Sequence, residues 1–286
     1  MSIKKYLEKS EDLTNKEILV TGGTSGIGLA LVKQLLSKNA KVVVLARDMQ
    51  KAEMVKNSLL ENYENPDISF IQYDQSDDES VVKVAKEIAE NHPDFYALVL
   101  NAGMAQRKKP TKFVDGYPVT LKTNYIGLAL LLENLLPLLK GKHRLIFQGS
   151  FVAGMHLKKI KSFKDDKISF WQQYFISKAG VEALFYYYSH SESSNEFICV
   201  EPGIAITGIV REFSNIIKSL ARTFSKVFSH SADKAALTAL CAIQSTTPSG
   251  SFIIPRGLFH LRGYPKIKKF PKRRMRPYLV EMLKKN

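Results

Sequence analysis

The feature that most constrains the fold is an alternation of short apolar runs with longer stretches of helical periodicity. The runs are rich in Val, Ile, Leu and Phe with little polar alternation, which is typical of strands covered on both faces. Between them lie helical patterns, for example over 26–38, 78–91 and 174–189. This alternation predicts an α/β fold with a doubly wound parallel sheet. The predicted strands are 17–20, 42–46, 68–73, 96–100, 145–148, 197–200 and 252–254.

The size and composition are those of one globular domain. The chain has 286 residues, 45% of them hydrophobic and 24% charged, which suits a single α/β domain. No apolar run reaches the ~18 residues of a membrane span, and the first residues lack the apolar core of a secretory signal. Neither the two cysteines nor the histidines have metal-ligand spacing. We therefore expect a cytoplasmic protein with reduced thiols and no metal.

The positive charge is concentrated at the C-terminal end. Residues 256–286 hold eleven Lys and Arg against one acid, Glu281, so they carry +10 of the formal net charge of +15. A solvated basic tail would explain this segment, and the alternative is peripheral contact with an anionic membrane. Nucleic acid is not expected, since no recognition motif accompanies the charge. We divide the chain into a catalytic domain over 1–255 and a basic extension over 256–286.

A glycine-rich loop follows the first predicted strand and precedes a helical pattern. Its sequence, TGGTSGIG over 21–28, has the spacing T-G-x-x-x-G-x-G. Glycines let the backbone approach a pyrophosphate closely, and a helix N-terminus presents free N–H groups to it. The loop therefore predicts a dinucleotide-binding site. The residues expected to contact the dinucleotide here are Gly22, Thr24, Ser25, Gly26, Ile27 and Gly28.

A cation follows the second predicted strand, where enzymes that use NAD carry an acid for the ribose 2′-hydroxyl. Here Ala46 ends the strand and Arg47 follows it. A guanidinium can bind a 2′-phosphate through two charge-assisted hydrogen bonds. We therefore favour NADP(H) over NAD(H) as the cofactor. The alternative is an exposed surface arginine that Asp48 partly neutralises.

A tyrosine and a lysine stand four residues apart on a predicted helix. Tyr174 and Lys178 form a Y-x-x-S-K sequence, and residues at i and i+4 share one helix face. Free tyrosine has a pKa of ~10, and a neighbouring Lys⁺ together with the positive charge of an oxidised nicotinamide favours the phenolate. The pair therefore predicts a general acid/base whose pKa is lowered by the lysine. Such pairs are also common as surface decoration, so the assignment depends on the other motifs.

Taken in order, these motifs resemble those of the short-chain dehydrogenase/reductase family. N-A-G at 101–103 and P-G-x-x-x-T at 202–207 match the family patterns as well, and the resemblance covers about residues 15–255. The stretch DGYPVTLKTN over 115–124 is similar to retinol dehydrogenase-like members. The resemblance implies a single-domain Rossmann fold of about seven strands and an NADP(H)-dependent oxidoreductase. Such an enzyme interconverts a carbonyl and an alcohol by hydride transfer.

The resemblance also assigns catalytic roles. It implies that Tyr174 is the general acid/base and Lys178 its partner. Ser150, after an apolar strand, would hold the substrate carbonyl oxygen, although Gly149 replaces a serine that the family often has beside it. Asn124 would hold a water that links the lysine to solvent. The expected catalytic set is therefore Asn124, Ser150, Tyr174 and Lys178.

Further cofactor contacts follow from the same resemblance. Asp74 would meet the adenine amino group, with a turn residue before a helix capped by Asp77 as the alternative. Asn101 and Gly103 would shape the floor under the adenosine ribose. Ile204 and Thr207 would hold the nicotinamide carboxamide. The expected set beyond the glycine loop is Arg47, Asp74, Asn101, Ala102, Gly103, Tyr174, Lys178, Pro202, Gly203, Ile204 and Thr207.

Two segments are expected to cap the substrate site, at about 151–173 and 204–230. The first is longer than in the family and contains Trp171, expected to pack the loop, and the second has an amphipathic helical pattern. An apolar small-molecule substrate is the resulting expectation. Helices around 114–139 and 174–189 are the family's usual faces for a homo-dimer or tetramer. The alternative function is a non-catalytic NADP-binding regulator or membrane-surface protein on the same fold.

Overall fold

The computed structural model describes residues 2–106, 111–155, 160, 162–204, 231–257 and 261–285. All seven predicted strands are present, each within one residue of its predicted ends. They run parallel as one sheet, which an eighth, antiparallel strand extends beyond β9. The strands are β1 (Glu17–Thr21), β2 (Lys41–Ala46), β3 (Ile68–Gln72), β4 (Ala97–Leu100), β7 (Arg144–Gln148), β8 (Glu196–Val200), β9 (Ser251–Pro255) and β10 (Pro265–Lys269).

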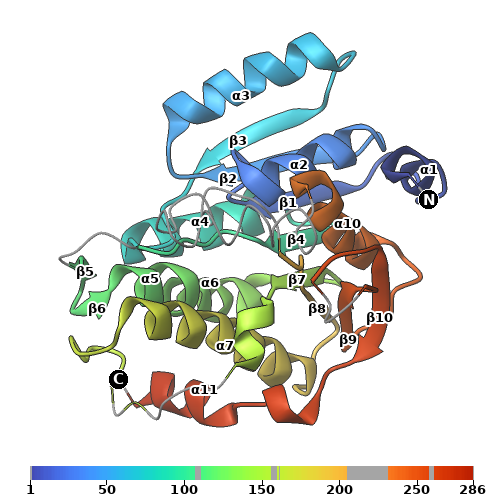
Figure 1. Ribbon diagram of the computed structural model, residues 1–286. Coiled ribbons are helices and arrows are strands. Elements are labelled where there is room, and N and C mark those ends of the chain that lie inside the picture. Colours follow the sequence, from blue (N-terminus) through green and yellow to red (C-terminus); the bar gives the residue numbers. More distant parts are fainter. Residues whose placement is uncertain are drawn as a thin grey trace, which may run out of the picture.

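Helices cover both faces of this sheet (Figure 1). The strands alternate their side chains between the two faces, so Ile18 of β1 packs with one helix layer and Leu19 with the other. Because both layers are apolar, the strands read as continuous apolar runs. One layer consists of α2 (Gly26–Leu36), α3 (Met49–Asn62) and α10 (Ala232–Ile243); the other contains α4 (Asp78–Asn91), α6 (Gly127–Leu135) and α7 (Phe170–Ser189). A short helix, α1 (Ile3–Glu8), precedes β1.

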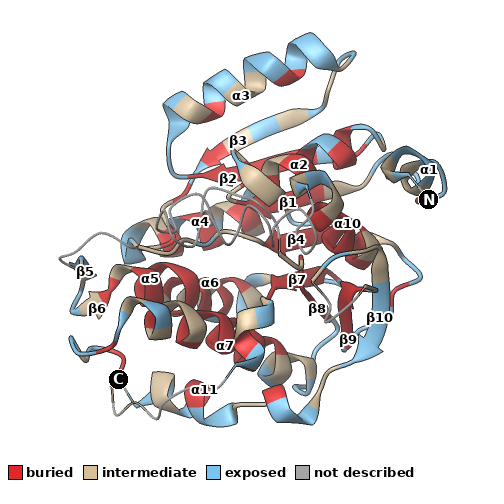
Figure 2. Ribbon diagram, in the orientation of Figure 1, coloured by how far each residue is buried: buried red, intermediate tan, exposed pale blue. Residues whose placement is uncertain are grey.

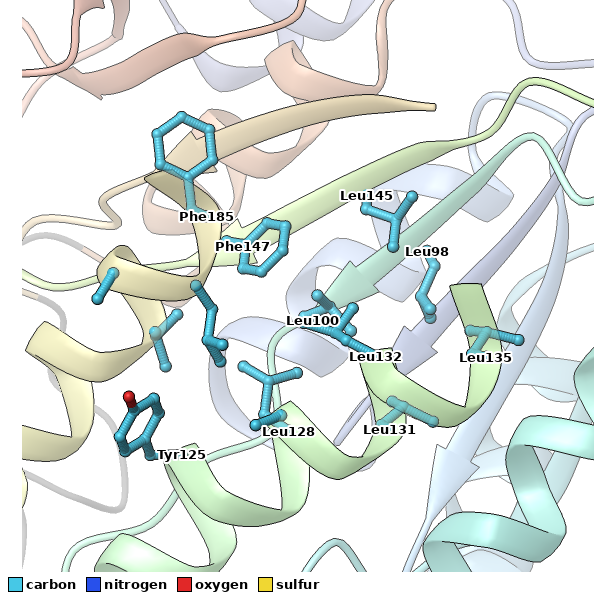
Figure 3. Packing of buried hydrophobic residues seen from close by; sticks show 14 of the residues in the cluster. Leu98, Leu100, Tyr125, Leu128, Leu131, Leu132, Leu135, Leu145, Phe147 and Phe185 are labelled. Carbon is cyan, nitrogen blue, oxygen red and sulfur yellow. The ribbon is translucent and has the colours of Figure 1, made fainter. Parts of the chain in front are cut away.

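The core beneath β4 and β7 holds the helix that carries Tyr174 and Lys178. Figure 3 shows leucines of α6 pointing toward the strands, with Phe147 and Phe185 closing the space beside α7. The Phe147 and Phe185 rings meet edge to face at 6.0 Å, a favourable geometry. Much of α7 is buried (Figure 2). The helix is therefore held rigidly along the sheet.

The segment before α6 differs from the predicted long helix over 114–139. A hairpin comes first, formed by β5 (Phe113–Val114) and β6 (Tyr117–Pro118). Asp115 and Gly116 between them have φ of 51° and 79°, and an Asp-Gly pair at positive φ is the preferred two-residue hairpin turn. The helix begins only at α5 (Val119–Leu121) and becomes a π-helix over Lys122–Ile126 before α6.

The C-terminal extension is folded against the domain, so its interpretation as a solvated tail is wrong. It supplies β10, a 3₁₀ turn at Lys272–Arg274 and α11 (Pro277–Lys284). Leu279 and Val280 of α11 are buried in the same core cluster as α7, and α11 lies beneath α7 in Figure 1. Exposed lysines of β10 carry part of the extension's charge, while Leu279 and Val280 face the core. No helix of the described residues is long and apolar enough to cross a membrane.

Candidate active site

The predicted site residues converge at one edge of the sheet. The strand order is β10-β9-β8-β7-β4-β1-β2-β3. The order in which strands are added reverses at β1, because β2 and β3 lie on one side of it and β4 lies on the other. Open α/β sheets bind ligands outside the carboxyl ends of their strands at such a switch point. The glycine loop follows β1 there, and N-A-G follows β4. The predicted catalytic serine follows β7, next along the sheet.

The geometry of the glycine loop requires glycine. Gly22 and Gly26 have φ of 70° and 56°, a region that side chains disfavour. A Cβ on Gly28 would lie 2.3 Å from the Gly22 carbonyl oxygen. Ser25 stands at the N-cap of α2 without a side-chain cap hydrogen bond. The loop and the first N–H groups of α2 therefore form a cradle that fits a dinucleotide pyrophosphate. Thr24 and Ile27 lie half-buried in the same turn.

N-A-G holds this loop in place. The Asn101 side-chain amide donates to the carbonyl oxygens of Thr21 at 2.9 Å and Gly22 at 3.3 Å. The Ala102 N–H donates to the Thr21 hydroxyl at 2.9 Å. A Cβ on Gly103 would lie 3.4 Å from both Asn124 Oδ1 and Lys178 Nζ. Gly103 thus opens the floor of the site beside the predicted catalytic groups.

Arg47 and Asp74 flank the glycine loop differently. Arg47 is exposed at the end of β2, while Asp48 caps α3 by accepting the Lys51 N–H at 2.9 Å. Asp74 Oδ1 accepts both the N–H and the hydroxyl of Ser76. Thus one Asp74 oxygen already holds the local turn, and an adenine contact would fall to the other. Asp77 is the N-cap of α4, as the sequence predicts.

Tyr174 lies in the second turn of α7, which begins four residues before the predicted start. Ser169 caps α7, accepting the Gln172 N–H at 3.4 Å. The Tyr174 phenol meets the Ser150 hydroxyl, and this contact lowers its pKa while burial, the larger effect, raises it. The net pKa is above its ordinary value of 10.0 in the protein alone, so the lowering expected from Lys178 together with an oxidised nicotinamide stays a prediction. At neutral pH the phenol therefore carries its proton.

Lys178 points toward the sheet and the floor of the site. Its Nζ donates to the Gln148 carbonyl oxygen at 3.0 Å and lies beside Gly103 and Asn124. The side chain is buried, and burial lowers its pKa to about 8 although Glu182 and Cys199 raise it. The described hydrogen bonds include none between Lys178 and Tyr174, so any electrostatic help from this lysine acts across space.

Asn124 occupies the π-helical segment, and both ends of its amide have partners. Its Oδ1 accepts the Met104 N–H at 2.8 Å, and its Nδ2 donates to the Met104 carbonyl at 2.8 Å and the Ser177 hydroxyl at 3.0 Å. The predicted water could therefore bind the backbone or the second acceptor site of Oδ1. π-Helical turns are frequent at functional sites; here a Cβ on Gly127, the residue after this turn, would lie 1.8 Å from the Gln75 carbonyl oxygen.

A buried charge cluster behind Ser150 was not found from the sequence. Glu182, one turn beyond Lys178, is 0% exposed, and Glu201 is 1% exposed. Both pair with Arg274 of the C-terminal extension. Burial raises the pKa of Glu182 to about 7, and Arg274 opposes that rise. The sequence offered one signal for Glu182, its place eight residues after Tyr174 on the same helix. Its partner Arg274 lies 92 residues away in the chain.

Gly149 is explained by this cluster. A Cβ there would lie 2.7 Å from Glu182 Oε1 and 3.3 Å from Cys199 Sγ. A serine at this position would collide with the carboxylate. The glycine at position 149, where the family often has a serine, therefore accompanies the buried Glu182 carboxylate.

P-G-x-x-x-T is only partly described. Pro202 and Gly203 follow β8, and Gly203 has φ of 74°. The Ile204 N–H donates to the Leu261 carbonyl oxygen at 2.8 Å, so a backbone contact to a carboxamide would fall to its own carbonyl oxygen. Thr207 and most of the predicted capping segment at 204–230 lie outside the described residues.

Aromatic side chains gather at the start of α7. The Trp171 ring lies tilted against those of Phe170, at 4.5 Å, and Phe175, at 6.0 Å, and it remains 38% exposed. Earlier in the same insertion, Phe163 is buried and packs edge to face on Tyr125 at 5.5 Å. The insertion is therefore anchored to the domain.

Among the described residues no cluster of three or more His, Cys, Asp or Glu could hold a metal ion.

Comparisons with known proteins agree with this geometry. A family model described as short chain dehydrogenase matches residues 16–216. An Armillaria gallica short-chain dehydrogenase/reductase is 31% identical over 85% of this chain and 82% of its own length. An uncharacterized oxidoreductase of Schizosaccharomyces pombe is 35% identical, but its match spans only 45% of this chain and 38% of its own length.

A solved structure extends the likeness to the fold. A short chain dehydrogenase from Burkholderia cenocepacia in complex with NADP has a TM-score of 0.65 at 20% identity, covering 82% of this chain and 92% of the other. The family match, the Armillaria relative and the site at the switch point lead to the same conclusion. The chain belongs to the short-chain dehydrogenase/reductase family of oxidoreductases.

Proposed function

We propose that this protein is an NADP(H)-dependent oxidoreductase that interconverts a carbonyl and an alcohol, with Tyr174 as its general acid/base. The observation that carries the proposal is the meeting of Tyr174 and Ser150 beside a cradle that fits a dinucleotide. A bound nicotinamide would supply or accept the hydride. The protein's own residues would position the carbonyl and move the proton.

The protonation state of Tyr174 suits the role of proton donor in carbonyl reduction. A buried phenol with a raised pKa is a proton donor at neutral pH, and reduction requires a proton on the carbonyl oxygen. The Ser150 hydroxyl would orient that oxygen toward the phenol. After the transfer, the charge on Lys178 would stabilise the phenolate through space. The same phenol would donate the proton in reduction and accept it in oxidation.

Proton resupply would run through the floor of the site. Lys178 has a pKa of about 8, so it holds and releases a proton near neutral pH. Asn124 lies against the same opening at Gly103, and its backbone could hold the water that leads to solvent. The side chain of Asn124 acts as a brace, because its amide is bound to Met104 and Ser177.

Arg47 supports a preference for NADP(H). It is exposed beside the glycine loop, and no described ion pair joins it to Asp48, so its guanidinium is available for a 2′-phosphate. The Burkholderia structure of the same fold was solved with NADP. NAD(H) is the weaker alternative, because no acid stands at the end of β2 for a ribose 2′-hydroxyl.

Exposed apolar side chains near the catalytic residues support an apolar substrate. Phe151 and Met155 follow Ser150, and Trp171 precedes Tyr174 by three residues. Their exposed fractions are 37%, 42% and 38%. Large apolar side chains left exposed around a polar centre are typical of binding sites. The catalytic residues are unnecessary in a non-catalytic regulator, so the enzyme is favoured over that alternative.

Assembly and membrane contact remain predictions. A homo-dimer or tetramer through α6 and α7 would have to accommodate α11, which packs on α7. Exposed lysines of β10, Lys266, Lys268 and Lys269, could attract an anionic membrane surface. They also serve on an edge strand to prevent pairing with other sheets, which is a sufficient explanation for them.

The experiment that tests the function is a screen of cofactor consumption. Purified protein is mixed with NADPH or NADH and a panel of aldehydes, ketones, retinoids and acyl-chain carbonyls, and loss of the reduced nicotinamide absorbance is followed. We expect turnover with NADPH and an apolar carbonyl. NADPH binding without turnover of any panel member would favour the regulator instead.

A further inference from the structure

Arg274 joins the C-terminal extension to three parts of the active-site wall. Its Nε donates to Glu182 Oε2 at 2.8 Å, and its Nη2 donates to the Ser150 carbonyl oxygen at 2.7 Å. Its Nη1 pairs with Glu201. The side chain is 5% exposed, so these contacts are shielded from water. A single guanidinium thus connects α7, the end of β7 and the end of β8.

The surroundings are built to hold this guanidinium. It stacks at 5.0 Å over the Phe252 ring of β9, and Gly149 leaves the space that the Glu182 carboxylate needs. Arg276, two residues on, donates to the carbonyl oxygens of Ala153 and Met155. Both arginines therefore fasten the turn that begins at Ser150.

The position of these contacts relates them to catalysis. Ser150 presents its hydroxyl to Tyr174 while its carbonyl oxygen is held by Arg274. Glu182 lies one helical turn from Lys178 and raises the pKa of that lysine. Arg274 touches neither the phenol nor the ammonium, so any effect on the reaction must act through Ser150 and Glu182.

We propose that Arg274 is a positioning residue of the active site, fixing the Ser150 turn and the Glu182 carboxylate so that the serine hydroxyl meets the phenol and the substrate oxygen. The inference rests on the proposed function. It makes the C-terminal extension a part of the catalytic machinery.

A second buried arginine provides a matched control. Arg144 is 3% exposed, pairs with Glu196 and donates to carbonyl oxygens of residues 242–247. It stands at the first residue of β7, the opposite end of the strand from Ser150. Losing either arginine leaves buried carboxylate or carbonyl groups without a partner, which destabilises a protein. Only Arg274 is joined to the active site.

The test compares Arg274→Met, Arg274→Lys and Arg144→Met with the wild type. Thermal unfolding, the dissociation constant for NADPH, and kcat and KM for the best carbonyl of the screen are measured well below each melting temperature. For Arg274→Met we expect kcat to fall by up to about 100-fold, the scale of misplacing a catalytic group by about 1 Å, while NADPH affinity changes by less than about threefold. Arg274→Lys should recover part of kcat, because an ammonium restores the positive charge but not the planar set of hydrogen-bond donors of a guanidinium.

Arg144→Met should lower the melting temperature with kcat within about threefold of the wild type. An Arg274→Met protein that is destabilised but keeps kcat within that range would overturn the proposal. If Arg274→Met does not fold, the same criterion applies to Arg274→Lys. A wild type without turnover refutes the proposed function itself, and this inference with it, whereas an active wild type with equally active Arg274 variants refutes this inference alone.

Discussion

Glu182→Gln tests the electrostatics of the site with an almost isosteric change. The carboxylate lies one turn from Lys178 and raises its pKa against the effect of burial. Glutamine keeps the shape and removes the charge, so burial should then lower the pKa of Lys178 further. The loss of charge on Lys178 would begin at a lower pH. We expect the high-pH limb of kcat/KM for carbonyl reduction to move downward.

The magnitude follows from the separation and the surroundings of the pair. An opposite charge within about 4–6 Å shifts a pKa by about 1–3, and Arg274 neutralises part of the Glu182 charge, so we expect about one pH unit. Glu182 is ionised at pH 8, since its pKa is about 7. At that pH the protonated fraction of Lys178 should fall from about one half to about one tenth, and kcat/KM by about fivefold. Near pH 6 the two proteins should agree, because Glu182 is then protonated in the wild type.

The charged and titratable groups near Glu182 and Lys178 also bear on how the shift is interpreted. Cys199 of β8 also acts on Lys178, and Arg274 and Glu201 act on Glu182. Arg276 also interacts electrostatically with Glu182, whereas Lys122 is bound to Asp78 and Asp115, Arg144 to Glu196, and Lys284 to Tyr187. The assay is the pH dependence of kcat/KM with the exposed Glu192→Gln as control. A limb that stays within experimental error of the wild type would refute the reasoning.

Two further substitutions test the cofactor site. Arg47→Ala should lower kcat/KM with NADPH about 10- to 150-fold, as loss of charge-assisted hydrogen bonds worth ~1.5–3 kcal/mol implies, and leave NADH nearly unchanged; an unaltered ratio of the two would remove Arg47 from the site. Gly28→Ala would place a Cβ 2.3 Å from the Gly22 carbonyl oxygen, so the loop must shift and NADPH affinity, measured by fluorescence titration, should fall at least tenfold. The control Gly250→Ala has open space around it but a φ of 76°, so it should lower stability through backbone strain and still bind NADPH normally.

The sheet was predictable because local sequence determines it. Each parallel strand is buried on both faces, so its apolar run is visible without knowledge of the partner strands. The glycine loop and Tyr174–Lys178 were predictable for a similar reason, since each acts through spacings within one turn. The hairpin at Asp115–Gly116 was missed although Asp-Gly is a turn signal, because the predicted helix was extended from the apolar run at 126–139 back across the turn.

The buried cluster was not predictable, since its members come from distant parts of the chain. Arg274 lies among lysines and arginines that are mostly exposed, and nothing in its local sequence distinguishes it from them. Only the pairing of strands and the docking of α11 bring it to Glu182 and Glu201. The raised pKa of Tyr174 was missed for the same reason: the expectation weighed the lysine one turn away, whereas burial by the whole fold is the larger effect.

The most direct measurement is turnover by Tyr174→Phe, with NADPH binding measured on the same preparation. The substitution removes one hydroxyl from a helix whose packing is otherwise kept. The account predicts that carbonyl reduction falls at least about a hundredfold, the contribution of a positioned acid, while the dissociation constant for NADPH stays close to that of the wild type. A variant that binds NADPH and reduces the carbonyl at nearly the wild-type rate would contradict the assignment of Tyr174 as the proton donor.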